Sequence, residues 1–151
     1  MPRFRRAAAA VLGAAAISSL LTACQKPTPE VTVLGGGKVV TITPSRYCFD
    51  SDHCRADKLD LPAFTVGADD KVMIDVPRQV ADRGWQVQAL SLKDIKTVLG
   101  SSGPIHDSHS YRVASNAGNG APFVVQVAEL SHGKPDGSMW SFVVTVSQTK
   151  V

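Results

Sequence analysis

"SMWSFVVTVS", residues 138–147, is the stretch that decides the fold class. Trp140, Phe142, Val144 and Val146 occupy every second position of this run, and small or polar residues occupy most of the positions between them. A period of two places one row of side chains on a buried face and the other row on an exposed face. The run therefore predicts a β-strand with Trp140 and Phe142 in the core.

Shorter runs with the same character recur along the chain. Five clear strands are expected at 31–34, 38–43, 71–76, 84–92 and 122–130, and three shorter ones around Tyr47, 61–66 and Tyr111 to Val113. Helix signals are few, and only the segments 78–84 and 92–100 predict a helical turn. Short strands separated by Gly, Pro, Asn and Asp predict, over residues 31–151, an antiparallel immunoglobulin-like sandwich of about seven to nine strands. A cupredoxin-like sandwich is the alternative.

The N-terminus has the composition of an export signal. Three arginines in residues 1–6 precede the apolar run 7–21, which is shorter than the ~20 residues that span a bilayer. Leu21 to Cys24 then matches a bacterial lipobox, in which a small residue precedes a cysteine that receives a lipid. We therefore expect residues 1–23 to be a lipoprotein signal peptide and Cys24 to be the lipidation site. The proline-spaced segment 24–30 would tether the domain within ~20 Å of the membrane.

The charge distribution argues against nucleic-acid binding. The chain has 16 basic and 13 acidic residues, but the first 23 residues hold three arginines and no acid. The remainder is formally neutral, and no clustered basic face of the kind that binds nucleic acid is visible in it.

The cysteine count agrees with export. The chain contains three cysteines, so a lipid on Cys24 leaves Cys48 and Cys54 to pair with each other. We expect a structural disulfide across "CFDSDHC", residues 48–54. Asp50, Asp52 and His53 lie within this loop, but the residues that follow lack the Gly and Glu of a calcium loop.

Three segments of the sequence together resemble those of a known family. The segments "CQKPTPEVTV" (24–33), "VADRGW" (80–85) and "WSFVVTV" (140–146) are similar to those of small actinobacterial lipoproteins that carry a domain of unknown function. The resemblance implies a β-rich protein of the cell envelope. It implies no biochemical activity.

The histidines suggest one alternative function. His106 and His109 are three residues apart, and His53 and His132 could join them from other loops. With Met73 and Met139 available, a copper or zinc site at His106 and His109 is the alternative hypothesis.

No catalytic motif is present. "GSSG" (100–103) is not a nucleophile elbow, and "GGG" (35–37) lacks the lysine of a phosphate loop. We therefore expect a non-catalytic binding module, with no cofactor, anchored on the extracytoplasmic face of the cell membrane beside an envelope protein partner. The segment Gly100 to Gly120 has loop composition and is the expected interaction surface.

Overall fold

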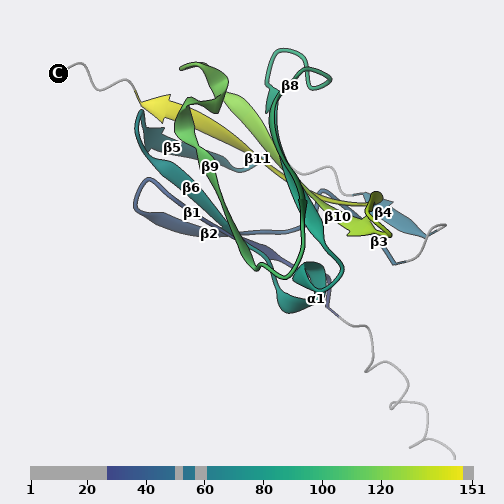
Figure 1. The fold of residues 1–151 in the computed structure, drawn as a ribbon. Coiled ribbons are helices and arrows are strands. Elements are labelled where there is room, and N and C mark those ends of the chain that lie inside the picture. Colours follow the sequence, from purple (N-terminus) through teal and green to yellow (C-terminus); the bar gives the residue numbers. More distant parts are fainter. Residues whose placement is uncertain (1–26, 50–52, 57–60, 148–151) are drawn as a thin grey trace, which may run out of the picture.

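Two β-sheets packed face to face make up the protein (Figure 1). The computed structural model describes residues 27–49, 53–56 and 61–147, and within these residues eleven strands are present. The predicted β-sandwich is therefore confirmed, with more strands than expected.

The first sheet is antiparallel throughout. Its order is β2-β1-β6-β9, which comprises β2 (Lys38–Ile42), β1 (Val31–Gly35), β6 (Lys71–Asp75) and β9 (Ser110–Ala114).

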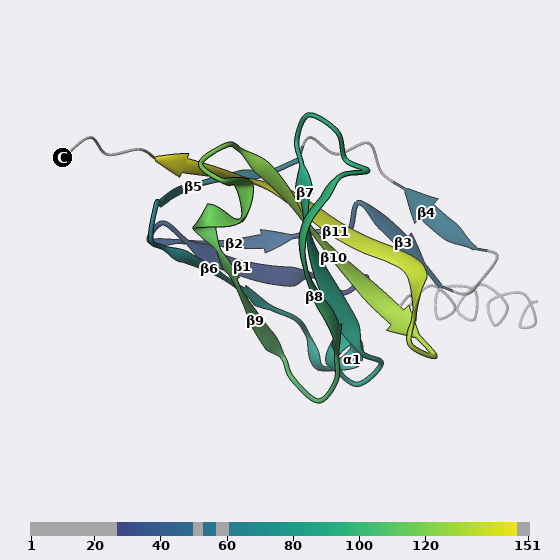
Figure 2. The ribbon, with the colours of Figure 1, turned by 45° about the horizontal axis from the view of Figure 1, so that its top comes forward.

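The second sheet has the order β4-β3-β11-β10-β7-β8. These strands are β4 (Cys54–Ala56), β3 (Arg46–Cys48), β11 (Lys134–Ser147), β10 (Phe123–Ser131), β7 (Trp85–Ser91) and β8 (Val98–Ile105). β5 (Ala63–Gly67) also pairs with β11, and this pair is parallel. Figure 2 shows the β3–β4 hairpin beside β11, away from the β1–β2 hairpin.

The strand order is that of an immunoglobulin-type sandwich. β1, β6 and β9 correspond to strands A, B and E of one sheet, and β8, β7, β10 and β11 correspond to C′, C, F and G of the other. The immunoglobulin-like prediction is thus confirmed. β2, β3 and β4 lie between the first strand and β5 in the chain and extend both sheets.

The core is built from the alternating positions that the sequence indicated. Val127 lies opposite Trp140 and Val125 opposite Phe142 in the β10–β11 pair, and all four side chains are fully buried. Phe142 also packs edge-on against Phe64 of β5, with ring centroids 5.4 Å apart. Burial of each large apolar side chain contributes about 1.5–3 kcal/mol, so these rows hold the two sheets together.

A single helical turn, α1 (Arg78–Ala81), joins β6 to β7. It follows Pro77 and ends where the backbone N–H of Gly84 donates to the carbonyl of Val80. Gly84 has φ 91°, a conformation that favours glycine, and its carbonyl accepts a hydrogen bond from Leu130 of β10. The turn predicted over 78–84 is confirmed.

The helical turn predicted over 92–100 is wrong. The Asp94 carboxylate accepts hydrogen bonds from the Lys96 backbone N–H (3.1 Å) and from the Thr97 hydroxyl (2.8 Å). Such short-range bonds compete with helix formation and favour a tight turn. The segment forms the β7–β8 turn instead.

The loop predicted over Gly100 to Gly120 is also wrong. β8, β9 and the 3₁₀ turn η1 (Ser115–Gly118) occupy most of it. β8 is an edge strand whose residues are all exposed or half-buried. Its positions therefore do not need large apolar side chains, and Gly, Ser and Pro can occupy them. Backbone pairing with β7 is enough to form it.

Candidate functional site

The start of the described chain lies against one end of the sandwich, which we call the entry end. The carbonyl of Pro29 accepts a hydrogen bond of 3.0 Å from the indole of Trp140. Pro27 and Thr28 line a small cavity together with Tyr47 of β3. Residues 1–26, which include the predicted signal peptide and Cys24, lie outside the described residues.

At the entry end, polar side chains follow the buried apolar side chains of β10 and β11. Glu129 follows Val125 and Val127 on the inward face of β10, and it pairs with Trp85 across the sheet. Arg83 lies in the turn between α1 and β7, two residues before Trp85. Asp136 and Ser138 lie on β11, four and two residues before Trp140. The polar cluster comprises Arg83, Glu129, Asp136 and Ser138.

One guanidinium nitrogen joins the two carboxylates of the polar cluster. Arg83 Nη1 lies 3.3 Å from Glu129 Oε1 and 3.9 Å from Asp136 Oδ2. The Glu129 side chain is 2% exposed, and among the described residues its Oε2 has no hydrogen-bond partner. Burial and, to a lesser extent, the nearby Asp136 carboxylate raise the pKa of Glu129 above its usual value, against the lowering effects of Arg83 and Ser138.

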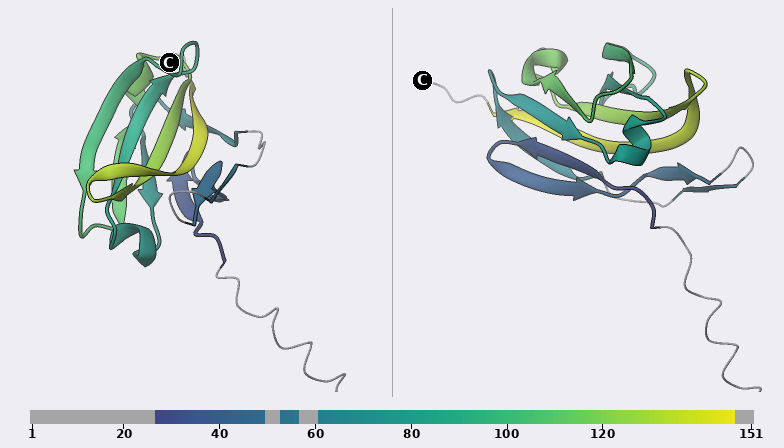
Figure 3. Two further views of the ribbon diagram at one scale, coloured as in Figure 1. Left: turned by 90° about the vertical axis from the view of Figure 1, so that its right-hand side faces the viewer. Right: turned by 60° about the horizontal axis from the view of Figure 1, so that its bottom comes forward.

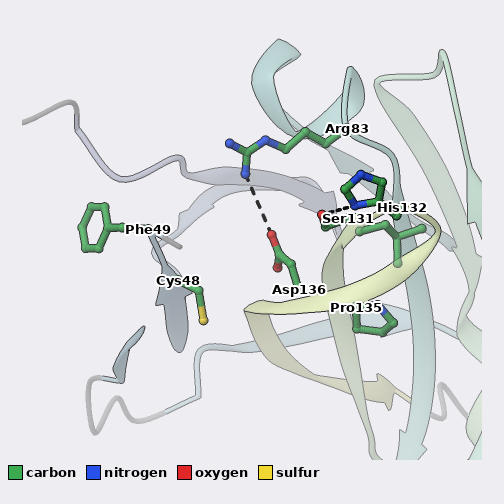
Figure 4. Close-up of a pocket in the computed structure, with 8 residues that line it drawn as sticks. Cys48, Phe49, Arg83, Ser131, His132, Pro135 and Asp136 are labelled. Carbon is green, nitrogen blue, oxygen red and sulfur yellow. Dashed lines mark hydrogen bonds and ion pairs between the residues drawn. The ribbon is translucent and has the colours of Figure 1, made fainter. Parts of the chain in front are cut away.

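A cavity of about 720 Å³ opens over the polar cluster. Arg83 and Asp136 point toward one another across it, while Phe49 and His132 lie on opposite sides (Figure 4). Its walls also include Cys48, Leu130, Ser131 and Pro135. Its volume falls within the ~300–1,000 Å³ range of small-molecule sites.

Phe49 separates this cavity from the smaller one at the start of the chain. The smaller cavity, of about 400 Å³, has Tyr47, Phe49 and Arg55 in its walls. The ring of Phe49 meets that of Tyr47 edge-on, with centroids 5.1 Å apart. Burial raises the pKa of Tyr47, and the Glu129 carboxylate is the second cause that raises it.

The predicted disulfide is present. Cys48 and Cys54 are bonded across the β3–β4 hairpin, where the two residues face each other in register. The bond fixes the position of Phe49, whose backbone N–H also donates to the carbonyl of His53. Asp50 and Asp52 lie outside the described residues.

The candidate metal ligands are dispersed. His106 follows β8 and its ring packs on Gly84, while His109 precedes β9 and its Nδ1 lies 3.4 Å from the Val76 carbonyl. His132 lies in the β10–β11 turn beside Ser131. Across the described ranges, no group of three or more His, Cys, Asp or Glu side chains is placed to hold a metal ion.

The two methionines considered as further ligands lie in different sheets. Met73 is in β6 of the first sheet, and Met139 is in β11 of the second.

A second surface feature lies at the far end of β7. Leu92, Ile95, Val98 and Leu99 are 45%, 67%, 52% and 40% exposed within the β7–β8 turn and the start of β8. We call residues 92–99 the apolar loop. β7 runs from Trp85 beside the polar cluster to Ser91 beside this loop, a distance of about 20 Å at 3.3 Å per residue. Figure 3 shows the loop and the entry end on opposite sides of the molecule.

The fold and the bonded hairpin define the class: an immunoglobulin-like β-sandwich with one disulfide among its described residues. The family model "Protein of unknown function (DUF2771)" matches residues 24–114, and the chain belongs to this family. The match covers β1 to β9 and ends before β10. No curated protein and no solved structure matches the chain. Within the described residues, no helix is long and apolar enough to cross a membrane.

The polar cluster was not anticipated from the sequence, although one signal for it was available. The alternation of Phe123, Val125 and Val127 continues to Glu129, which predicts an inward-facing carboxylate. Arg83 and Asp136 could not be assigned to the same site, because their meeting depends on the pairing of β7, β10 and β11.

Proposed function

We propose that the protein is a lipid-anchored, non-catalytic binding module of the cell envelope. In this proposal residues 1–23 are removed, Cys24 carries the lipid, and the sandwich engages another protein of the envelope. Membership of a family of unknown function is compatible with such a role, and a disulfide is compatible with a location outside the cytoplasm.

The apolar loop is the observation that carries the proposal. Four large apolar side chains within eight residues are exposed there, and clusters of exposed apolar side chains mark interaction sites. Hydrogen bonds to the Asp94 carboxylate fix the turn, and they also lower the pKa of Asp94. A loop that is ordered before binding loses less conformational entropy on association.

The charge of the apolar loop indicates the partner's chemistry. Lys93 and Lys96 are exposed between the apolar residues, while the Asp94 carboxylate is engaged within the turn. A complementary surface would be an apolar depression bordered by carboxylates. Because the loop lies at the end opposite the chain entry, we infer that this partner is a protein lying away from the anchoring membrane.

A charge placed in the apolar loop tests the proposal. We expect Ile95→Glu to abolish co-purification of the partner from membranes of cells that express the full chain. Val39→Glu is the matched control, because Val39 is equally exposed (66%) but lies on β2, in the other sheet. Carbodiimide crosslinking should join Lys93 or Lys96 to a partner carboxylate. Equal recovery of the partner with both variants would overturn the proposal.

The anchor is tested separately. Cys24→Ala should move the protein from the membrane fraction to the soluble fraction, and mass spectrometry of the wild-type N-terminal peptide should show a diacylglyceryl group on Cys24. An unmodified Cys24 thiol in the membrane-associated protein would contradict the anchor but not the binding surface.

The copper or zinc alternative at His106 and His109 stays a prediction. Stoichiometric metal in the purified chain that is lost in His106→Ala would support it.

A further inference from the structure

We propose that the cavity at the entry end binds a ligand carrying a primary ammonium group. The polar cluster presents two carboxylates, Glu129 and Asp136, to a single guanidinium. With both acids ionised the cluster carries an excess negative charge. A buried carboxylate that lacks a counter-charge is costly, so a cationic ligand would stabilise the ionised form.

Asp136 has the geometry to receive such a ligand. Its Oδ1 accepts the Ser138 backbone N–H at 2.8 Å, whereas its Oδ2 lies 3.9 Å from Arg83 Nη1, at the outer limit of an ion pair. The side chain is 13% exposed and lines the cavity. Oδ2 therefore retains capacity to accept a hydrogen bond from a ligand N–H.

A second unfilled acceptor belongs to the same polar cluster. Glu129 contacts the same Arg83 nitrogen through Oε1, and its Oε2 is the buried oxygen that lacks a partner among the described residues. Buried polar atoms are almost always hydrogen-bonded, so an orphaned oxygen in this cluster indicates a missing donor. Arg83 lines the cavity and holds the other oxygen of this carboxylate, and because its side chain is 56% exposed it can move outward to admit the ligand.

The walls suit an alkylammonium better than a bare cation or an anion. Phe49 is 63% exposed at the cavity rim, and an aromatic face attracts a cation and covers its alkyl chain. A divalent metal would need more oxygen ligands than the cluster offers. An anion would meet a guanidinium that two carboxylates already share.

Titration of n-butylammonium into the full chain in nonionic detergent tests the inference, with 1-butanol as the neutral control. We expect saturable heat of binding for the amine and none for the alcohol. Asp136→Asn should weaken binding about tenfold or more, the usual effect of losing a charge-assisted hydrogen bond. Asp69→Asn, which alters an exposed carboxylate in the β5–β6 turn, should leave the affinity unchanged.

A replacement variant and two further ligands complete the binding experiment. If Asp136→Asn does not fold, Phe49→Ala replaces it, because Phe49 is exposed and its loss should weaken binding several-fold without unfolding the domain. Glycerophosphoethanolamine and 1,4-diaminobutane distinguish a lipid headgroup from a free amine as the source. Equal binding of butylammonium and butanol, no binding at millimolar concentration, or unchanged affinity in Asp136→Asn would each overturn the inference.

Discussion

Replacing Glu129 by Gln should remove a pH dependence from the stability of the protein. Burial raises the pKa of Glu129 in the folded state above the value of about 4.3 expected for an unfolded chain. Between these two pKa values the folded state binds more protons than the unfolded state. The free energy of unfolding therefore falls as pH rises through this window, and it is constant with respect to this group below and above it.

The size of this pH dependence follows from the binding of a single proton to Glu129. A single group contributes a slope of at most about 1.4 kcal/mol per pH unit within the window. Glu129→Gln lacks the titrating group, so its free energy of unfolding relative to wild type should rise with pH by up to this slope and then level off. Because Glu129 and Asp136 share Arg83, the difference reports Glu129 together with its coupling to Asp136.

Urea unfolding followed by tryptophan fluorescence between pH 4 and 8 measures this difference. Trp85 and Trp140 are both fully buried, so both report loss of the core. Asp69→Asn is the control and should give a curve parallel to that of wild type. A Glu129→Gln difference that stays constant with pH, or that falls as pH rises, would refute the burial argument.

Three further predictions concern stability and are measured by urea unfolding. Replacing Cys48 and Cys54 by Ser should cost roughly 2 kcal/mol, the chain-entropy contribution of a six-residue separation, and added reductant should then have no further effect on this variant. Gly36→Ala should be more destabilising than Gly37→Ala: both residues have positive φ, but an added Cβ at Gly36 collides with the Thr65 carbonyl, whereas at Gly37 it meets nothing within 4 Å. Phe142→Ala should cost about 3–5 kcal/mol, because it opens a cavity among fully buried side chains, and a cost below 1 kcal/mol would contradict the described core.

The strands predicted correctly are those in which burial imposes a period of two. In β11 the alternation of Trp140, Phe142 and Val144 is visible in the sequence because each inward residue packs against the opposite sheet. β8 could not be found in this way. Its edge position leaves its side chains without a burial pattern, and pairing with β7 alone determines its conformation.

The residues of the candidate site also differ in how far the sequence could predict them. Residues that act within one hairpin were predictable, as the Cys48–Cys54 disulfide shows. Arg83 comes from the turn before β7, Glu129 from β10 and Asp136 from β11, and only the β7–β10–β11 register brings them to one place. Without the register of these strands, the sequence does not show that the three side chains lie close together.

The two proposed surfaces can be separated experimentally because the sandwich keeps them apart. About 20 Å of β7, paired on both sides by β8 and β10, lies between the apolar loop and the polar cluster. Substitutions at sites this far apart with no shared contacts act additively. Ile95→Glu should therefore leave the affinity for n-butylammonium unchanged, and Asp136→Asn should leave partner recovery unchanged. If either substitution altered both measurements, the ends would be coupled through the second sheet, and the core would have to adopt two packings rather than one.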